Sequence, residues 1–562
     1  MPLGLQVVYP PDQHQTTAAQ IFFIGTAAPQ WPVAVNGLVV ERSPQGHFAP
    51  SFPLGLGENL FTFSHGSQRL QLRVTRIGDH PDPPENLALL NLQPNWPVAR
   101  LPGELICLGA IAPAGAQVVV DLGNLQLPLR STTGNARLPS SQAILTGRYQ
   151  PQPGVRQHQG CFIAQNPGKI IPQFTANYAE QVVQQAGAAI EILSPANLEV
   201  VEITSDFATT RTGPGSNFSR LTPLPRGTRA GVTGRDGDWL RLDYGAWLRV
   251  TETRPLPDAP LPHSRIRGIS SRRAAGATEV LFPLEVAVPL SIQQDRHSLT
   301  LTLHNTTAQT DTIRLDDDPV IAGFSWQQYP GRVEYRWQFK SSQQWGYGLH
   351  YEGTTLVLSL RHPPVLGDRL AGVTILLDPG HGGSSDIGAV GPNGIAEKDI
   401  NLTISRLLRE HLTQLGATVV MTREDDREVS LGDRIALINQ LRPTLALSIH
   451  YNALPDDGDA LHTQGVGMFW YHPQSRDLAV FLHNYLVQKL GRPSYGIYWH
   501  NLALTRPHIA PAVLLELGFM INPLEFEWIS DPQGQRELAA TLSEAIATWL
   551  TRTAAAGSAF AN

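Results

Sequence analysis

Short apolar runs and helix-like periodicity alternate in the last third of the chain. Val373 to Leu377, Leu445 to Ile449 and Pro511 to Leu515 are apolar runs that end in turn-forming or polar residues, which predicts buried strands. After the first run, apolar residues recur at the spacing of one helix face: Ile400, Ile404, Leu407, Leu408, Leu412 and Leu415. Strands that alternate with helices predict an α/β domain over residues 370–553, with a mostly parallel central sheet flanked by helices.

The chain before Pro364 has a different pattern, in which short apolar or alternating runs are separated by Gly and Pro. The chain has 50 Gly and 45 Pro, and most of them lie in this part, which predicts short strands and many turns. Asn36-Gly37, for example, separates two apolar runs and predicts a two-residue hairpin turn. The predicted fold is multidomain, with N-terminal all-β domains followed by one C-terminal α/β domain.

Shifts in composition divide the chain into segments. Their predicted structures are a β-sandwich over 1–100, a β-rich segment over 101–195 that forms a second sandwich or extends the first, a barrel of short strands over 196–253, a linker over 254–275, an antiparallel β-domain over 276–365, and a tail over 554–562. Within the first two segments, Pro81 to Pro84 and Pro94 to Pro102 predict linkers or exposed loops.

Two of the β-rich segments resemble known domain families. Residues 1–100 loosely resemble the Ig-like domains attached to envelope and carbohydrate enzymes. Thr210 to Gly215, followed by the Gly-Asp-Trp and Gly-Ala-Trp turns at Trp239 and Trp247, resembles the bacterial SH3-like barrel that is often fused to cell-wall hydrolases. That resemblance implies targeting to the wall. Both tryptophans fit a barrel core or a ligand platform, and the core is favoured. The antiparallel segment is similar, by analogy alone, to envelope-binding β-domains.

Charge and cysteine content exclude some classes of function. The formal net charge is −6, so no polyanion-binding surface is predicted and nucleic acid is not an expected partner. No apolar run reaches the roughly 18 residues of a membrane-spanning helix. Cys107 and Cys161 are too few for a disulfide scaffold. They either pair with each other or form two buried thiols, and the second is the favoured prediction.

Three predicted strands of the α/β domain end in residues that can bind metal or carry protons. His381 follows the first strand, His450 the second, and Glu516 the third, while Glu397 closes the glycine-rich loop after His381 and opens a helix. Ligands collect at the carboxyl ends of strands in such sheets. Two histidines and one carboxylate, with a fourth position for water, form a catalytic zinc site, and the remaining carboxylate can serve as a general base. Taken alone, Glu397 also fits a simple first-turn residue.

The same segments resemble one enzyme family. DPGHGG from Asp378, SIHYNA from Ser448 and PAVLLELGF from Pro511, with Glu397 between the first two, look like the motifs of the zinc-dependent N-acetylmuramoyl-L-alanine amidases. The resemblance covers about Gly372 to Leu550, and includes Thr422-Arg423, Leu431 and Arg434. It implies a peptidoglycan hydrolase that cuts the amide between N-acetylmuramic acid and L-alanine. It also implies that His381, Glu397 and His450 hold Zn²⁺ and that Glu516 is catalytic.

Further residues are candidates for supporting roles. Asp378 and Asn452 are predicted to orient the histidines, and Asn452 also to contact substrate, although both fit simple turn residues. Arg506 is predicted to bind a substrate carboxylate, with a structural ion pair as the alternative. The segment Ala453 to Gln464 is short and lacks helical periodicity. We therefore expect no helix that blocks the site and no need for an activator protein.

Location and alternative functions complete the predictions. Peptidoglycan as partner implies the periplasm or cell envelope, yet Met1 to Pro11 lacks the features of a secretory signal, so either the true start lies upstream or export uses another route. A wall-binding protein without activity is the competing hypothesis, opposed by the complete set of four site residues. A zinc peptidase of another fold is disfavoured because the chain has no H-E-x-x-H motif.

Overall fold

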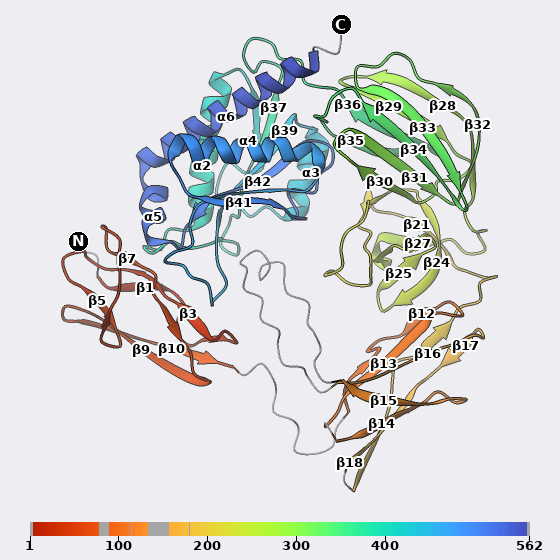
Figure 1. Ribbon diagram of the computed structural model, residues 1–562, viewed down its shortest axis with the longest axis horizontal. Helices are drawn as coiled ribbons and strands as arrows, with labels where there is room; N and C mark the ends of the chain where they lie inside the picture. The colour runs from red at the N-terminus through yellow and green to blue at the C-terminus, as the bar shows by residue number, and fades with distance from the viewer. Residues whose placement is uncertain (1–3, 78–88, 114, 133–156, 179, 559–562) are drawn as a thin grey trace.

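The computed structural model describes residues 4–77, 89–113, 115–132, 157–178 and 180–558. All α-helices of this described part lie after residue 396, and the earlier part consists of strands, turns and one 3₁₀ turn. Figure 1 shows the arrangement: an α/β unit is contacted on one side by the N-terminal strands and on another by a β-sandwich, and the remaining strands extend away from it.

The N-terminal unit, residues 4–77, is a small β-structure around a core of aromatic and aliphatic side chains that includes Phe23, Phe48 and Phe63. The predicted hairpin turn is confirmed, since Asn36 and Gly37 have φ values of 50° and 85° between paired strands. Its strands are β1 (Gln6–Tyr9), β2 (His14–Thr16), β3 (Gln20–Phe22), β4 (Ile24–Thr26), β5 (Val33–Val35), β6 (Leu38–Val39), β7 (His47–Phe48), β8 (Ser51–Pro53), β9 (Gly57–His65) and β10 (Gln68–Arg76).

The second unit, within residues 89–192, has its own core and a seven-stranded sheet in the order β11-β13-β16-β15-β14-β18-β19. The prediction of exposed loops over Pro94 to Pro102 is wrong in part, because β12 lies there and pairs with β20 and β24. Pro81 to Pro84 lies outside the described residues. The strands are β11 (Leu90–Gln93), β12 (Val98–Arg100), β13 (Leu105–Ile111), β14 (Gln117–Asp121), β15 (Gln126–Thr132), β16 (Gln157–Ile163), β17 (Gly168–Ile170), β18 (Gln173–Tyr178), β19 (Gln181–Ala186) and β20 (Ile190–Ile192).

The two cysteines form a disulfide, so the prediction of buried thiols is wrong. Cys107 and Cys161 are opposite each other on the antiparallel strands β13 and β16. Both side chains are exposed on the same face of the sheet. Directly opposed positions on neighbouring strands bring the two cysteines close enough to bond, although they are 54 positions apart in the sequence.

The third unit, residues 200–255, consists of short strands joined by tight turns. Trp239 and Trp247 are 8% and 7% exposed, which favours the core alternative, and arginine side chains lie over both rings. β24 pairs with β12, so the second and third units share a sheet. The strands are β21 (Val200–Ile203), β22 (Phe207–Ala208), β23 (Leu224–Pro225), β24 (Arg229–Asp236), β25 (Trp239–Leu242), β26 (Trp247–Arg249) and β27 (Thr253–Pro255), with the 3₁₀ turn η1 (Val250–Glu252).

The sandwich unit, residues 264–361, replaces part of the predicted linker. Residues 264–274 form the long strand β28, whose arginines are on the surface. Two of them pair with glutamates, Arg265 with Glu285 and Arg272 with Glu279 and Glu352. A run of arginines therefore marks the outer face of a strand here. Two sheets pack together, and one pair, β28 with β32, is parallel. The strands are β28 (Ser264–Ala274), β29 (Ala277–Pro283), β30 (Leu290–Gln294), β31 (Ser298–His304), β32 (Thr306–Arg314), β33 (Ile321–Tyr329), β34 (Arg332–Phe339), β35 (Tyr347–Glu352) and β36 (Thr355–Arg361).

The α/β unit contains a six-stranded sheet in the order β38-β37-β39-β42-β40-β41. Neighbouring strands run parallel except β40 and β42. Helix α6 continues to Ser558, so the predicted tail is helical as far as the structure describes it. The elements are β37 (Thr374–Pro379), α2 (Glu397–Gln414), β38 (Thr418–Met421), α3 (Leu431–Leu441), β39 (Leu445–Asn452), β40 (Val466–Trp470), α4 (Pro473–Leu490), β41 (Ser494–Trp499), β42 (Ala512–Phe519), α5 (Pro523–Ser530) and α6 (Pro532–Ser558).

Helices and loops cover both faces of this sheet. Alternate residues of β37, such as Ile375 and Leu377, pack against α2, α4 and α6, while the residue between them, Leu376, packs toward α3. Burial on both faces explains why the strands are continuous apolar runs rather than alternating ones. Among the helices of the described residues, none has the length and apolar character to cross a membrane.

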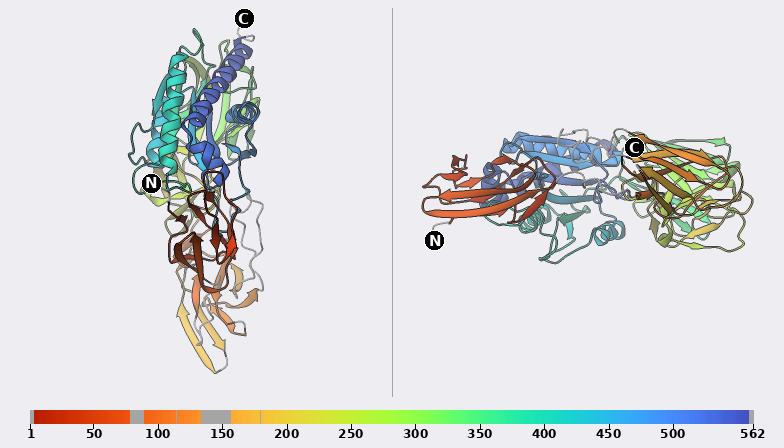
Figure 2. Two further views of the ribbon diagram at one scale, coloured as in Figure 1. Left: turned by 90° about the vertical axis from the view of Figure 1, so that its left-hand side faces the viewer. Right: turned by 90° about the horizontal axis from the view of Figure 1, so that it is seen from below.

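The N-terminal unit packs against the loop that follows β39. Asp456 in this loop accepts hydrogen bonds from Tyr9 and from His14, the latter at 2.9 Å, and its backbone oxygen accepts from Phe22 N at 3.3 Å. Phe22 also shares a buried cluster with Phe519, the last residue of the strand that carries Glu516. Figure 2 shows the same neighbourhood from two further directions. Residues near both ends of the chain thus meet beside the carboxyl edge of the sheet.

Asp456→Asn is expected to weaken this contact. The carboxylate is only partly exposed and is paired with His14, so its loss is expected to lower the free energy of local opening by about 1–3 kcal/mol. Hydrogen exchange of peptides 14–24 and 453–464 measures the change. Asp459→Asn, in the same loop but bonded to His462, is the matched control. Equal protection in the Asp456 variant and the wild type would contradict the assigned contact.

Candidate metal centre

Three neighbouring strands bring the predicted residues together at one edge of the sheet. β39 lies between β37 and β42, with Pro379 opposite Ile449 and His450 opposite Glu516. His381 follows β37 by two residues, and Glu397 begins α2. Parallel strands end at the same edge, which explains how residues more than 100 positions apart converge.

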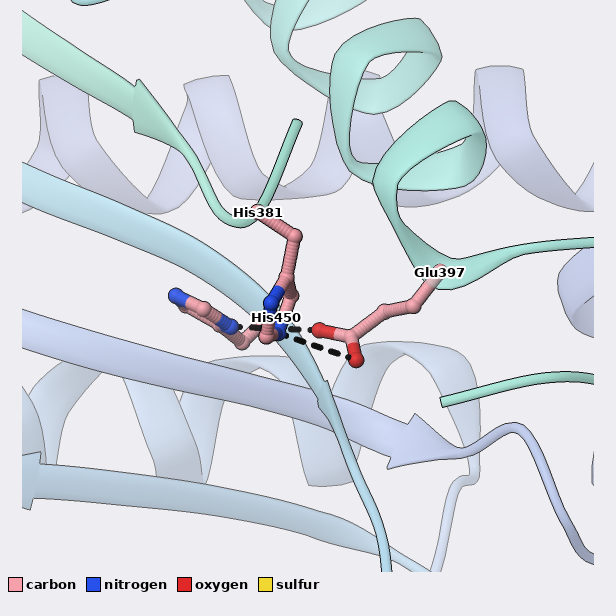
Figure 3. A group of neighbouring side chains, drawn as sticks. All are labelled: His381, Glu397 and His450. Atoms are coloured by element: carbon pink, nitrogen blue, oxygen red, sulfur yellow. Dashed lines mark hydrogen bonds and ion pairs between the residues drawn. The ribbon is translucent and has the colours of Figure 1, made fainter. Parts of the chain in front are cut away.

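His381, Glu397 and His450 form one cluster, shown in Figure 3, in which a nitrogen or oxygen of each lies within 4.8 Å of the others. Glu397 contacts both rings: its Oε2 is 3.2 Å from His381 Nε2, and its Oε1 is 3.1 Å from His450 Nδ1. Two imidazoles and one carboxylate, all pointing to one volume, are a set of donors for a divalent metal ion.

Backbone and side-chain donors hold Glu397 in place. Ala389 N donates to its Oε2 at 2.8 Å, Tyr451 N donates to Oε1 at 3.0 Å, and Asn401 Nδ2 donates to Oε1 at 3.1 Å. Burial raises the pKa of Glu397, but the two histidines outweigh burial and hold its pKa well below the usual range. The carboxylate is therefore ionised, as a metal ligand must be.

The backbone of His381 and its contact with Asp386 fix the orientation of the imidazole ring. His381 itself has φ of 61°, an uncommon value for a residue with a side chain. Its Nδ1 contacts Asp386 at 2.5 Å, which leaves Nε2 to face Glu397. Burial lowers the pKa of His381, but Glu397 and Asp386 together outweigh it and raise the pKa to about 9. Asp386 therefore fixes the ring orientation, a role that metal-binding histidines commonly require.

Gly380→Ala is expected to displace the His450 ring. A Cβ at Gly380 would lie 2.2 Å from Cε1 and 2.4 Å from Nε2 of that ring, closer than real contacts allow. Since the φ of Gly380 is not positive, the substitution acts through this clash rather than through the backbone. We expect metal affinity to fall at least about 10-fold, as when ligand orientation is lost. Gly432→Ala, in helix α3 with only Ser430 nearby, should bind metal as the wild type does.

Glu516 is adjacent to the cluster, and one of its carboxylate oxygens has no hydrogen-bond partner among the described residues. Its Oε2 is buried without a hydrogen bond in the described residues, which is a costly state for a carboxylate oxygen. Burial, and next the charge of Glu397, raise the pKa of Glu516 well above its usual value. A buried carboxylate beside a second one, with a free oxygen, is suited to accept and release a proton.

Asp378 and Asn452 do not contact the histidine rings. Asp378 is buried and accepts hydrogen bonds from Thr422, Ser448 and Arg434, and Arg434 also donates to the His381 carbonyl oxygen at 2.8 Å. Asp378 thus supports the loop backbone through Arg434. The Asn452 side chain accepts from Ala453 N at 2.9 Å, which is the turn alternative.

Arg506 lies away from the cluster. It precedes β42, and its carbonyl oxygen faces His472 Nε2 at 2.8 Å, beyond the end of β40. Because β40 runs antiparallel to β42, with Gly467 opposite Glu516, this region is at the other edge of the sheet. At ~3.3 Å per residue the separation is on the order of 15 Å. The structure does not bring Arg506 together with the metal ligands.

Asp386, Asn401 and Gly380 were missed by the sequence interpretation. Asn401 follows Glu397 by four positions on α2, a spacing that places two side chains on one helix face and could have identified it. Asp386 lies in the same glycine-rich loop as His381, but its approach to Nδ1 depends on a loop path that no periodicity predicts.

Comparison with known proteins gives a consistent result. The family model described as N-acetylmuramoyl-L-alanine amidase matches residues 375–548. The germination-specific N-acetylmuramoyl-L-alanine amidase of Bacillus subtilis is 32% identical over 201 residues, covering 32% of this chain and 81% of that protein. The probable cell wall amidase LytH of Staphylococcus epidermidis is 37% identical over 164 residues, covering 29% of this chain and 53% of that protein, so the match spans about half of LytH.

Solved structures are also similar. The catalytic domain of CwlV, an N-acetylmuramoyl-L-alanine amidase from Bacillus (Paenibacillus) polymyxa var. colistinus, has 28% sequence identity and a TM-score of 0.30, covering 32% of this chain and 98% of that one. The matched family region contains all three cluster residues and Glu516. On the strength of the family match and the Bacillus relative, this chain belongs to the N-acetylmuramoyl-L-alanine amidase family.

Proposed function

We propose that the protein is a zinc-dependent peptidoglycan hydrolase that cleaves the amide between N-acetylmuramic acid and L-alanine of the stem peptide. The observation that supports this most is the convergence of His381, Glu397 and His450 within 4.8 Å, with Glu516 on the neighbouring strand. The buried, unpartnered Oε2 of Glu516 fits a site in which a bound water or substrate proton completes the hydrogen bonding.

Zinc held by these three ligands would supply a Lewis acid and lower the pKa of a water molecule to about 7. Glu516 accepts a proton from the attacking water, whose oxygen bonds to the carbonyl carbon of the lactyl amide. The C–N bond then breaks, and Glu516 returns the proton to the departing nitrogen of L-alanine. The products are a lactyl carboxylate on the sugar and a free amino group on the peptide, so atoms and charge balance.

Asp386, Asn401 and Arg434 act on the ligands and their loop. Asp386 holds the His381 ring, Asn401 holds the Glu397 carboxylate, and Arg434 holds the backbone after β37 through the oxygens of Pro379 and His381. Such supporting contacts keep the ligands in one geometry, so little reorganisation is needed when metal and substrate bind.

The β-rich units are proposed to attach the enzyme to the wall. The third unit, with its short strands and buried tryptophans, supports an SH3-like domain, and one of the relatives named above is a probable cell wall amidase. We place the protein in the periplasm or cell envelope, with peptidoglycan as its partner.

Digestion of purified sacculi tests the proposed reaction. The full chain with zinc, and with no added protein, should release material with new L-alanine amino termini. Residues 453–465, all described, contain no helix that could cover the site, so no activator should be required. Release of other amino termini, or of reducing sugar ends alone, would reject the amidase reaction. Cleavage that began only after adding a second protein would reject the expectation of independence.

A further inference from the structure

A cavity of about 620 Å³ opens where the third unit, the sandwich unit and the α/β unit meet. Its volume is in the range of sites for small organic ligands, ~300–1,000 Å³. Flat apolar rings line it: Phe207 from the third unit, and Trp470, Tyr471 and Trp499 from the α/β unit. Trp499 is 62% exposed, although its indole is oriented by a 3.0 Å bond from Nε1 to the Tyr471 carbonyl oxygen. The indole packs against the Tyr471 ring, with centroids 5.3 Å apart, and the rest of its surface is open to a ligand.

Arg220 and Arg506 carry the positive charge of this cavity. No Asp or Glu is among its lining residues, and within the described chain neither arginine has a carboxylate within 4.0 Å. Arg220 donates to Thr209 Oγ1 at 3.3 Å, and Arg506 Nε donates to the Leu502 carbonyl oxygen at 3.0 Å. Burial, and next the charges of Arg220 and Arg211, lower the pKa of Arg506 to about 10, so it stays charged at neutral pH.

The histidines of the cavity do not add to this charge. Burial lowers the pKa of His472 to about 4 and that of His508 to about 3, so both are neutral at pH 7. The charge of Glu252 reaches Arg220, but Glu252 makes no ion pair with either arginine within the described chain. Two guanidinium groups close enough to affect each other, with no carboxylate bonded to them, favour an anionic ligand. The neighbouring aromatic faces favour a ligand that also has a flat apolar face, such as the C–H face of a sugar ring.

The cavity is separate from the metal centre, since Arg506 and Trp470 lie at the opposite edge of the sheet. A ligand bound in this cavity therefore does not place the amide that is cleaved at the metal centre. We propose that this cavity binds a carboxylated amino sugar, namely N-acetylmuramic acid in glycan from which the peptide has been removed. This inference rests on the proposed function, because hydrolysis converts a neutral lactyl amide into the carboxylate that the two arginines would recognise. The cavity thus distinguishes cleaved from intact glycan.

Binding to the full-length Glu516→Gln chain tests this inference, with tryptophan fluorescence and calorimetry as readouts. The probe is a peptide-free disaccharide of N-acetylglucosamine and N-acetylmuramic acid with a free lactyl carboxylate. Three other ligands are compared with this probe. They are chitobiose (which lacks the carboxylate), the dipeptide L-Ala-D-Glu, and inorganic phosphate. We expect the disaccharide to bind most tightly, and Arg220→Gln and Arg506→Gln each to weaken it at least about 10-fold, as for the loss of a charged pair. Arg314→Gln, an exposed arginine paired with Asp316, should change nothing.

Trp499→Ala provides a variant that cannot fail through misfolding of the core, since the side chain is mostly exposed, and it should also weaken the disaccharide. Equal affinity for chitobiose, or unchanged affinity in both arginine variants, would overturn the inference. So would tighter binding of the dipeptide or phosphate, which would assign the cavity to another anion. Binding is measured without cleavage. If the wild-type chain digests sacculi but does not bind the disaccharide, that result rejects this inference alone. A chain that binds the disaccharide without cleaving sacculi rejects the proposed function.

Discussion

Glu516→Gln is expected to abolish hydrolysis while zinc stays bound. The amide keeps the size of the carboxylate but cannot accept a proton from water, so kcat should fall by about 10³-fold or more, in the range of a lost general base. Glu516 is outside the ligand cluster, so zinc content should remain that of the wild type. Release of L-alanine amino termini from sacculi measures the first effect, and elemental analysis of the purified chain measures the second.

Glu544→Gln is the matched control for this variant, because Glu544 lies on helix α6 and pairs only loosely with Lys489 at 3.8 Å. It should digest sacculi at the wild-type rate. If the Glu516 variant retained a tenth or more of the activity, another group would have to serve as the base. If it lost zinc as well as activity, Glu516 would belong to the ligand set.

His381→Ala is expected to remove both metal and activity. Two ligands remain, which is fewer than the three protein ligands of catalytic zinc sites, so affinity for zinc should fall by well over about 100-fold. Competition with a fluorescent zinc chelator measures the affinity. His462→Ala, on an exposed loop and bonded to Asp459, is the control and should keep full zinc content.

Asp386→Asn should give an intermediate result, since it removes the partner of His381 Nδ1 and leaves the ligand itself. A loss of about 10- to 100-fold in zinc affinity is the range for such supporting residues. An Asp386 variant as severely impaired as His381→Ala would indicate that the carboxylate binds the metal directly, which would contradict the assigned cluster.

The sequence predicts the α/β unit far better than the β-rich part. Buried parallel strands are continuous apolar runs whose carboxyl ends carry functional residues, so the sequence alone predicts that His381, His450 and Glu516 lie at one edge of the sheet. Asp378 shows the limit of that reasoning: it lies one strand position from the loop, but its partner is Arg434 rather than a ligand ring. Strand ends predict which residues gather, whereas loop paths decide which of them touch.

The β-rich units are harder to predict from the sequence because their short strands pair with strands that are distant along the chain. The pairing of Cys107 with Cys161 depends on β13 and β16 being neighbours, which the local sequence of neither strand indicates. The segment that forms β28 was predicted to be a linker because of its arginines. These arginines lie on the outer face of the strand, while Ile266 and Ile269 are buried. Arg506 was predicted to bind a substrate carboxylate because it precedes the strand that carries Glu516, although the start and end of a strand lie at opposite edges of the sheet.

Anomalous scattering at the zinc edge from crystals of the full chain grown with zinc tests the central claim most directly. One peak should lie about 2.0–2.2 Å from His381 Nε2, His450 Nδ1 and a Glu397 oxygen, with Glu516 beside it but not bound to it. A peak elsewhere, or none at these three residues in a zinc-loaded chain, would contradict the account.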